Sequence, residues 1–373
     1  MQLRKALNSA VDRLTGQRVP SPRMNAELLI MFTLDCNRAY LYAHPERELT
    51  AEEMSRYDDA LARRATGIPA QYITGHQEFW GMDLIVSPAV LIPRPETEHV
   101  VEAVLELARE RTGCEERLDH KGHEGAQRQK RLDHLRHEKT QRKPAASNEP
   151  KTLHIVDVGT GSGAIALALA KELPMAEIHA TDISAEALEV AQANAARHEL
   201  SSRIAFHHAD LLRCFLPAIS GEAHHPTHEG IQQASCGLGV TDDAPTTESA
   251  IKAAAEAATQ DLTGTATLRL EFDFVVSNPP YVGESEEDQV QLDVRRFEPR
   301  NAVFAGPTGL EVIERLIAEA HEVLRPGGWL VFEISGTIVN GVRRLLERWE
   351  EVAIKNDLQG IARVAVARKS LHA

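Results

Sequence analysis

The apolar positions at the start of the chain repeat at the spacing of amphipathic helices. Between residues 3 and 14 they recur at intervals of three and four, which places them on one face of a helix. Ser21, followed directly by a proline, predicts the cap and first turn of a second helix. Thr50 and Glu53 have the spacing of a capping box, which predicts the start of a third helix. We therefore expect a small helical domain over residues 1–75.

The next segment, residues 76–111, has mixed character. Residues 79–86 predict a short β-like stretch, and residues 91–98 contain two prolines that interrupt regular structure. From residue 98 to residue 109 the pattern predicts a helix. We interpret this segment as a connection of β-structure and helix between the helical domain and the rest of the chain.

From residue 153 onward, apolar strand-like runs alternate with amphipathic helical segments. This alternation is typical of the α/β class, in which helices cover a parallel sheet. The expected strands cover residues 153–158, 177–182, 204–207, 272–277 and 329–334, with final β-prone stretches at 352–355 and 361–367. The expected helices follow Gly163, Ser184, Thr308 and Ile338. This α/β domain is expected to span residues 151–373.

Two segments break this order and are interpreted as insertions. Residues 112–150 hold almost no large apolar side chain, and the polar sequence at 117–124 recurs nearly intact at 131–138. Residues 217–268 contain no aromatic residue and are rich in Ala, Thr, Gly and His. Both compositions offer little apolar surface for packing, and we assign neither insertion a function.

The composition of the 373 residues is that of an ordinary globular protein, with 43% apolar and 26% charged residues. A formal net charge of −14 argues against a nucleic acid as direct partner, because binding to phosphate groups needs a basic face. No apolar run approaches the length of about 18 residues that a membrane span needs, and the start lacks the apolar core of a secretory signal. We expect a cytoplasmic protein with no membrane partner. The four cysteines lie far apart and predict neither a metal site nor a disulfide framework.

A glycine-rich turn follows the first strand of the expected α/β domain. Residues 157–163 read Asp-Val-Gly-Thr-Gly-Ser-Gly and end where a helix should begin, so that free backbone amides favour polar or anionic ligand groups. The spacing is GxGxG, whereas a dinucleotide fingerprint is GxGxxG, and a different nucleoside cofactor is therefore favoured. The alternative is a tight turn that binds no ligand.

Two acidic residues follow the next two strands. Asp182 ends the second strand, where a carboxylate can accept both hydroxyls of a ribose, although it is also placed to cap the helix near Ser184. Asp210 follows the third strand and is placed to accept from an adenine amino group. A glycine loop and two acids at successive strand ends describe an adenosine site in the crevice of a doubly wound sheet. This pattern resembles the Rossmann-like class I S-adenosylmethionine-dependent methyltransferases.

The fourth strand runs directly into the sequence Asn-Pro-Pro-Tyr at residues 278–281. The two prolines fix φ and remove backbone donors, which leaves carbonyl groups and the Asn278 side chain directed into the crevice. If the Asn278 side-chain oxygen and the Pro279 carbonyl each accept one N–H of a planar amide or arylamine, they align its nitrogen with a methyl donor and stabilise the developing positive charge. Tyr281 can stack on the planar group. A turn that only ends the strand is the alternative.

Further motifs make the resemblance specific. Residues 71–75 (Gln-Tyr-Ile-Thr-Gly), 79–81 (Phe-Trp-Gly), 92–98 (Ile-Pro-Arg-Pro-Glu-Thr-Glu) and 296–299 (Arg-Phe-Glu-Pro) accompany the glycine loop and Asn-Pro-Pro-Tyr. With the helical front domain, they resemble the peptide chain release factor glutamine methyltransferases. These bacterial enzymes methylate the side-chain amide nitrogen (N5) of the glutamine in the Gly-Gly-Gln motif of release factors. The resemblance implies S-adenosyl-L-methionine as cofactor and the Gly-Gly-Gln domain of release factors as partner.

Carried over by position, the resemblance implies roles for individual residues. The cofactor would be bound by Gly159, Thr160, Gly161, Ser162, Gly163, Asp182, Asp210, Leu211 and Asn278. Catalysis would fall to Asn278, Pro279 and Tyr281, and substrate binding to these residues with Pro280, Arg94 and Glu96. Two positions depart from the family pattern: Leu211 replaces a bulkier aromatic residue beside adenine, and Glu333-Ile-Ser replaces the more usual Glu-Ile-Gly.

Two other functions compete with glutamine methylation. Asn-Pro-Pro-Tyr is shared with adenine-N6 methyltransferases, but an enzyme acting on DNA or RNA needs a basic recognition surface. The residues up to Trp80 instead hold 10 basic and 10 acidic side chains. A non-catalytic adenosine-binding module is the second alternative, and an intact Asn-Pro-Pro-Tyr beside the glycine loop argues against it.

Overall fold

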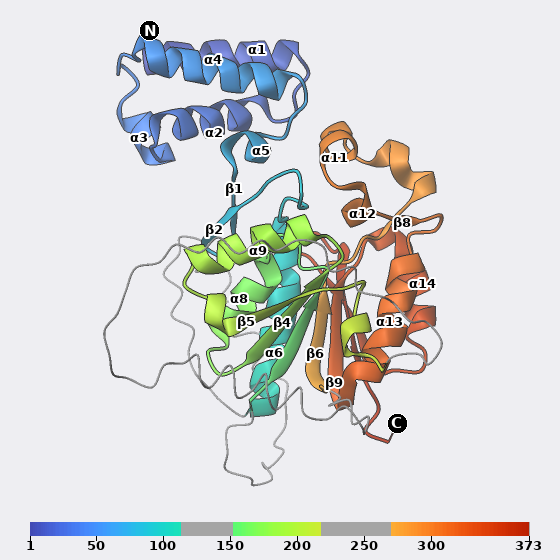
Figure 1. The fold of residues 1–373 in the computed structure, drawn as a ribbon. Helices are drawn as coiled ribbons and strands as arrows, with labels where there is room; N and C mark the ends of the chain where they lie inside the picture. Colours follow the sequence, from blue (N-terminus) through green and yellow to red (C-terminus); the bar gives the residue numbers. More distant parts are fainter. Residues whose placement is uncertain (113–151, 218–269, 373) are drawn as a thin grey trace, which may run out of the picture. The chain divides into compact units, whose positions relative to one another are not determined.

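The computed structural model of the protein describes residues 1–112, 152–217 and 270–372 (Figure 1). The two insertions expected at 112–150 and 217–268 therefore lie, apart from their outermost residues, outside the described part of the chain. The described residues include an amino-terminal group of helices, a β-hairpin followed by a long helix, and a seven-stranded sheet with covering helices. Among these residues, none of the helices has the length and apolar character needed to cross a membrane.

The amino-terminal helices form their own apolar core. They are α1 (Leu3–Gly16), α2 (Pro22–Leu34), α3 (Arg38–Ala43), α4 (Ala51–Ala65) and α5 (Ala70–Thr74). The apolar face expected between residues 3 and 14 is confirmed, because Leu3, Leu7 and Leu14 are buried in this core beside Leu29 and Tyr57. The short helices α3 and α5 were not expected, because segments of five or six residues are too short to show a helical period.

The two predicted helix starts have different outcomes. Helix α4 begins with the expected capping box, in which Thr50 Oγ1 accepts from the Glu53 amide and Glu53 accepts from the Thr50 amide. Helix α2 begins as expected, with Ser21 at the N-cap and Pro22 in the first turn, but Ser21 has a left-handed backbone conformation and its side chain makes no capping bond. Asn25 instead donates its Nδ2 to the Pro20 carbonyl at 2.8 Å and to the Ser21 carbonyl at 3.1 Å.

The connecting segment contains a hairpin where a single β-like stretch was expected. Strands β1 (His76–Phe79) and β2 (Met82–Ile85) pair antiparallel, and Trp80 and Gly81 turn the chain between them with φ of 55° and 69°. The 3₁₀ helix η1 (Pro95–Thr97) then leads into α6 (Glu98–Thr112), which extends the helix expected to end at residue 109.

The sheet is parallel except for one strand. Its strands are β3 (His154–Val158), β4 (Glu177–Asp182), β5 (Ile204–His208), β6 (Phe272–Ser277), β9 (Leu324–Glu333), β10 (Glu350–Asn356) and β11 (Ala362–Arg368). They lie in the order β10-β11-β9-β6-β3-β4-β5, and β11 runs antiparallel to both of its neighbours. Strands β4 and β5 lie on one side of β3, whereas β6 and β9 lie on its other side, so the strand order reverses between β3 and β6. Ligands of open α/β sheets bind beside such a reversal, at the carboxyl ends of the strands.

The helices of the sheet domain follow the strands as expected. They are α8 (Ala164–Glu172), α9 (Ala185–Arg197), α13 (Glu311–Val323) and α14 (Val339–Leu345). Shorter elements complete the described residues: η3 (Ser201–Arg203), η4 (Arg213–Phe215), β7 (Val282–Gly283), η5 (Glu284–Gln289), α11 (Leu292–Phe297), α12 (Arg300–Val303), β8 (Phe304–Gly306) and η6 (Gly336–Ile338). Strand β9 begins at Leu324 and not at residue 329, because a register shift beside Phe272 lets Leu324 also pair with β6.

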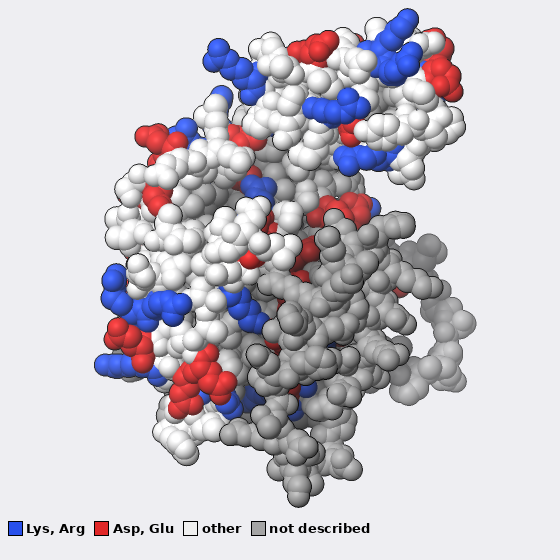
Figure 2. Space-filling view, turned by 180° about the vertical axis from the view of Figure 1, so that it is seen from behind, with Lys and Arg blue, Asp and Glu red and all other residues white. Residues whose placement is uncertain are grey.

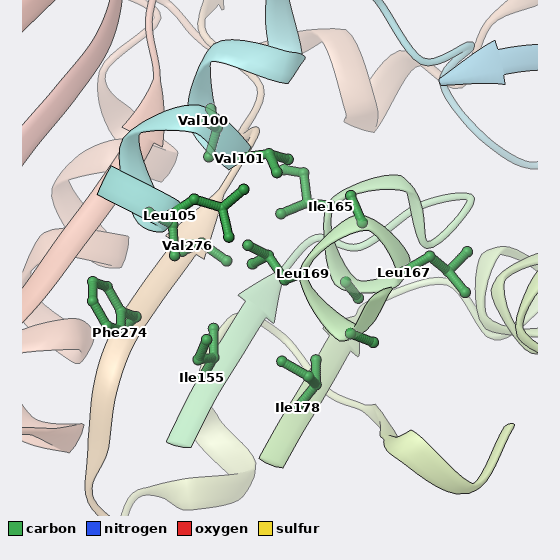
Figure 3. Close-up of a cluster of buried hydrophobic side chains, with 14 of the residues drawn as sticks. Val100, Val101, Leu105, Ile155, Ile165, Leu167, Leu169, Ile178, Phe274 and Val276 are labelled. Carbon is green, nitrogen blue, oxygen red and sulfur yellow. The ribbon is translucent and has the colours of Figure 1, made fainter. Parts of the chain in front are cut away.

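The main core lies between the sheet and the two helices α6 and α8. Figure 3 shows Val101 and Leu105 of α6 close to Ile165 and Leu169 of α8, with Ile155 and Ile178 of the sheet below them and Phe274 and Val276 on the neighbouring strand. All of these side chains are buried. Packing of α8 on the sheet fixes the glycine-rich turn that precedes this helix, so the core holds the candidate site in place.

Candidate active site

The glycine loop joins β3 to α8 at the carboxyl edge of the sheet. Gly159, Gly161 and Gly163 have φ of 69°, 54° and 84°, a region that other residues rarely adopt. The amides of Gly159 and Thr160 both donate to the Thr181 carbonyl at 2.9 Å, which ties the loop to the end of β4. A Cβ at Gly159 or Gly161 would meet no described atom within 4 Å, whereas one at Gly163 would lie 3.1 Å from a side chain of α8. The first two glycines therefore leave open space beside the backbone, and the third allows close packing of the helix.

Buried polar side chains form hydrogen bonds that hold the glycine loop in place. Asp157 Oδ2 accepts from the Thr160 hydroxyl at 2.6 Å and from the Ala166 amide at 3.1 Å. Burial raises the pKa of Asp157 to about 7. Ser162 is also buried, and its carbonyl accepts from Asn194 of α9 at 2.9 Å. These contacts fix the shape of the loop before any ligand binds.

Asp182 lies directly beside the glycine loop. Its Oδ2 accepts from the Gly161 amide at 2.8 Å, and its Oδ1 accepts from the Ser184 amide at 2.9 Å. Burial raises the pKa of Asp182, and these backbone donors act in the opposite direction. Helix α9 is capped by Ser184, whose Oγ accepts from the Ala187 amide at 3.1 Å. Asp182 thus joins the loop to the start of α9, and its contact with ribose stays a prediction.

The residues predicted to meet adenine follow β5. Asp210 accepts from Arg315 of α13 at 2.6 Å, so one of its oxygens is already engaged in an ion pair. Leu211 has φ of 52°, a left-handed backbone conformation that is unusual for a residue with a Cβ. Both residues lie at the carboxyl edge of the sheet, and their contacts with adenine stay predictions.

A groove of about 540 Å³ opens at the Asn-Pro-Pro-Tyr sequence. Residues lining it from the sheet domain are Asn278, Pro279, Pro280, Tyr281, Val294 and Glu298, and from the preceding segments Met24, Gln71, Ile92 and Arg94. Tyr281, Pro280 and Asn278 are partly exposed to this space, whereas Pro279 is buried. The groove therefore brings together all four residues of the motif with Arg94, and their roles in catalysis and substrate binding stay predictions.

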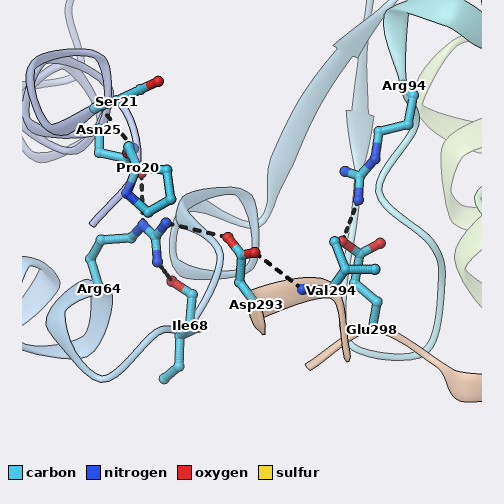
Figure 4. A network of polar contacts seen from close by, with 9 residues as sticks. All are labelled: Pro20, Ser21, Asn25, Arg64, Ile68, Arg94, Asp293, Val294 and Glu298. Carbon is cyan, nitrogen blue, oxygen red and sulfur yellow. Dashed lines mark hydrogen bonds and ion pairs between the residues drawn. The ribbon is translucent and has the colours of Figure 1, made fainter. Parts of the chain in front are cut away.

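The groove also brings two separate sequence motifs into contact. Glu298, from Arg-Phe-Glu-Pro, is 7% exposed, accepts from the Ile92 amide at 3.1 Å and forms an ion pair with Arg94 (Figure 4). Pairing with a buried carboxylate holds the Arg94 guanidinium at the groove wall. Glu96 does not line the groove, because it pairs with Arg363 at 3.7 Å, and its role in substrate binding stays a prediction.

Arg64 of α4 forms a second polar network in the same groove. It is 4% exposed and donates to the Asn25 side chain at 2.7 Å and to the Ile68 carbonyl at 3.2 Å (Figure 4). Its remaining contact is an ion pair with Asp293 of α11 at 3.4 Å. Burial lowers the pKa of Arg64, and Asp293 acts in the opposite direction. The pair links the amino-terminal helices to the segment that follows Asn-Pro-Pro-Tyr.

Two residues that contact the motif were missed from the sequence. Thr97 Oγ1 lies 3.0 Å from Asn278 Nδ2, and Glu333 accepts from the Tyr281 hydroxyl at 2.9 Å. Thr97 lies within the motif that contains Arg94, and Glu333 begins the atypical Glu-Ile-Ser. The sequence therefore marks both positions but indicates no function for either side chain. Ser277 pairs with Phe332 across β6 and β9, which brings Glu333 close to the motif, and Thr97 of η1 contacts both Asn278 and Glu333.

The fold and the site together define a class of protein. A sheet of this order, an open glycine loop at its reversal point and Asn-Pro-Pro-Tyr at the end of the adjacent strand are the features of a Rossmann-like class I methyltransferase. Two family models match the chain: "PrmC N-terminal domain" at residues 5–75 and "Methyltransferase domain" at residues 149–218.

Full-length relatives narrow the class to a family. A protein of Koribacter versatilis named release factor glutamine methyltransferase is 42% identical, and the match covers 99% of each chain. Proteins of the same name from Moorella thermoacetica and Xylella fastidiosa are 35% and 32% identical, over 98% and 96% of this chain and 98% of each relative. The chain belongs to the release factor glutamine methyltransferase family.

Proposed function

We propose that the protein transfers a methyl group from S-adenosyl-L-methionine to the side-chain amide nitrogen (N5) of the glutamine in the Gly-Gly-Gln motif of peptide chain release factors. The observation that carries this proposal is the register of the sheet. Val158 pairs with Ser277 across β3 and β6, and the Ser277 hydroxyl donates to the Val158 carbonyl at 2.7 Å. The next residues along the two strands are Gly159 and Asn278, so the glycine loop and the amide-binding motif begin side by side.

The residues around the loop fit S-adenosylmethionine. Gly159 and Gly161 leave open space beside their backbone, which lets a ligand approach closely. Asp182 provides a carboxylate at the end of β4, where it suits the ribose hydroxyls. When bound, the cofactor supplies a methyl group on a positively charged sulfur. The glycine loop and Asp182 would hold the adenosine part, and Asn278 lies at the neighbouring strand end, where it would hold the methyl acceptor.

The Asn-Pro-Pro-Tyr residues would orient the glutamine amide. An amide nitrogen is a weak nucleophile, because its lone pair is delocalised into the carbonyl group. Asn278 Oδ1 and the Pro279 carbonyl each accept one of its N–H groups, which fixes the direction of attack and stabilises the positive charge that develops on nitrogen. The apolar walls of the groove, among them Ile92 and Val294, exclude water and strengthen these contacts.

The groove also suits a protein loop better than a nucleic acid. Its walls contain both the Arg94–Glu298 pair and the Arg64–Asp293 pair, so its positive charges are already matched by carboxylates. On the face shown in Figure 2, Lys and Arg lie interspersed with Asp and Glu over the described residues. Binding to a phosphate backbone requires unmatched basic side chains. A glutamine that follows two small glycines can enter a narrow groove, and these features support a release factor as substrate over adenine in DNA or RNA.

Transfer of labelled methyl groups from S-adenosylmethionine tests the proposal. The acceptors are a purified release factor, the same factor with the glutamine of Gly-Gly-Gln replaced by alanine, and double-stranded DNA. Label on the intact factor alone is the expected result. Equal labelling of the alanine variant would show that another residue is methylated, and preferential labelling of DNA would favour the adenine-N6 activity.

A further inference from the structure

Four side chains form a continuous chain of hydrogen bonds at the carboxyl edge of the sheet. Glu333 at the end of β9 is 1% exposed; its Oε2 accepts from the Thr97 hydroxyl at 2.6 Å, and its Oε1 accepts from the Tyr281 hydroxyl at 2.9 Å. Thr97 is 4% exposed, and its Oγ1 also lies 3.0 Å from Nδ2 of Asn278. The chain thus connects a buried carboxylate with the side chain that would hold the substrate amide.

The chemistry of these groups fixes which of them donates and which accepts in each hydrogen bond. An ionised carboxylate only accepts hydrogen bonds, so Thr97 and Tyr281 must each donate to Glu333. The Thr97 hydroxyl has a single proton, and once it points to Glu333 only lone pairs remain for Asn278. Asn278 must therefore turn its NH₂ group towards Thr97, because the opposite orientation would place two acceptors against each other. Its Oδ1 is then directed away from Thr97.

We infer that Thr97 and Glu333 are positioning residues that fix the side-chain amide of Asn278 with its oxygen available to the substrate. This inference rests on the proposed function, because it concerns the same contact between Asn278 and the glutamine amide. Without the Thr97 hydroxyl, the Asn278 amide gains a second orientation in which its NH₂ group faces the NH₂ group of the substrate. Two donors then oppose each other, and the substrate nitrogen loses an acceptor that aligns it.

The protonation state of Glu333 affects the direction in which these hydrogen bonds are donated. Burial raises the pKa of the Glu333 carboxyl, and the hydrogen bonds from Thr97 and Tyr281 act in the opposite direction. Glu96 further raises the pKa and Arg363 lowers it. Burial is the larger effect, and the two hydroxyl donors oppose it by stabilising the ionised form, in which both carboxylate oxygens accept and Asn278 has the orientation described above.

A matched pair of variants tests the inference. Thr97→Val keeps the shape of the side chain and removes the hydroxyl, whereas Thr97→Ser keeps the hydroxyl and removes a methyl group. We expect Thr97→Val to lower the single-turnover rate of release factor methylation at least about tenfold and Thr97→Ser to restore it to within about threefold of wild type. Cofactor affinity, measured by calorimetry, should be unchanged in both. Equal rates for the two variants would overturn the inference, whichever rate they share.

A double-mutant cycle separates positioning from general damage. Because Thr97 acts through Asn278, Thr97→Val should slow the Asn278→Ala enzyme by less than about twofold. Effects that multiply would overturn the inference, since a structural defect acts independently of Asn278. Thr97→Ala is measured beside Thr97→Val, so that the result does not depend on the folding of one variant. If the wild-type enzyme leaves the release factor unmethylated, the proposed function fails; normal methylation by Thr97→Val refutes the positioning role alone.

Discussion

At the scale of single residues, Asn278 owes its place to strand register more than to its neighbours in the sequence. It follows Ser277, which pairs with Val158 beside the glycine loop, and its Nδ2 is held by Thr97 from a segment 181 residues away. Asn-Pro-Pro-Tyr by itself predicted an amide-binding motif. Which atom of the Asn278 side chain faces the substrate depends on Thr97 and Glu333, which the sequence did not connect with it.

Asp182→Ala should weaken cofactor binding without changing the rate at saturating cofactor. The carboxylate lies beside Gly161 and is expected to hold the ribose, which is remote from the transferred methyl group. Ser184→Ala is the matched control, because it removes the cap of α9 and leaves the Asp182 carboxylate in place. Calorimetry should show a clear loss of S-adenosylmethionine affinity only in Asp182→Ala. Equal losses in both variants would indicate that Asp182 acts through the start of α9.

Asp157 should make the free energy of unfolding of the cofactor-free protein decrease as the pH rises. Its folded-state pKa of about 7 lies above the ordinary value of 3.8, so between these values the folded protein keeps a proton that the unfolded chain has released. Asp157→Asn lacks this titration, whereas all other groups are common to both proteins. From pH 4 to pH 7, the free energy of unfolding of wild type should therefore fall relative to Asp157→Asn, by at most about 4 kcal/mol. Urea unfolding curves give this difference, and a constant offset between the proteins would contradict the prediction.

At the scale of elements, long periodic segments were predicted well and short or reversing ones were not. The expected strands at 177–182 and 272–277 coincide with β4 and β6. Apolar and polar positions alternate in β4, β6 is mostly apolar, and each strand ends at a polar residue. The β-like stretch at 79–86 was wrong in form, since the left-handed conformation of Trp80 creates a hairpin that the residue type does not favour. Local pattern fixes an element only where tertiary contacts do not override it.

Gly309→Ala should disturb the segment around Tyr281, between β6 and β7. Gly309 has φ of 82°, and a Cβ there would lie 2.5 Å from the Tyr281 carbonyl, too close for any packing. Gly360 is the matched control, because its φ is 80° but a Cβ would meet no described atom within 4 Å. Both alanine variants bear backbone strain of about 1–2 kcal/mol. Only Gly309→Ala should lose methyl transfer beyond this change in stability, and equal activity of the two folded variants would contradict the role of close approach.

At the scale of the whole molecule, the first insertion begins and ends, and the second insertion ends, at the edge of the sheet opposite the candidate active site. The second insertion begins after η4, which follows the carboxyl end of β5. Arg111 precedes the first insertion, His154 follows it, and Asp273 follows the second. The first two contact the buried Asp273 carboxylate, which pairs with Arg111 at 3.1 Å and accepts from the His154 amide at 3.0 Å. These residues lie at the amino ends of β3 and β6, whereas Gly159 and Asn278 lie beyond the carboxyl ends.

Replacing residues 113–151 and 218–269 by short Gly/Ser linkers should preserve methylation of an isolated Gly-Gly-Gln domain, because both segments are connections between elements and their compositions offer little apolar surface for packing. Loop length changes stability only slowly, by about 0.6 kcal/mol per doubling. The measurement is methyl transfer at saturating cofactor, with circular dichroism and cofactor binding as controls for folding. A linker variant that is folded and binds the cofactor but no longer methylates this domain would show that an insertion contributes to the substrate site.

The sequence by itself determined the α/β class, the order of strands and helices, the glycine loop and the Asn-Pro-Pro-Tyr motif. These features are local, since each depends on the period or spacing of a few neighbouring residues. Only the tertiary structure decided that Glu298 holds Arg94, that Glu96 turns to Arg363, and that Thr97 and Glu333 orient Asn278. These contacts join residues 181 to 267 positions apart. Strand order and helix packing set such distances, and no local pattern of side chains encodes them.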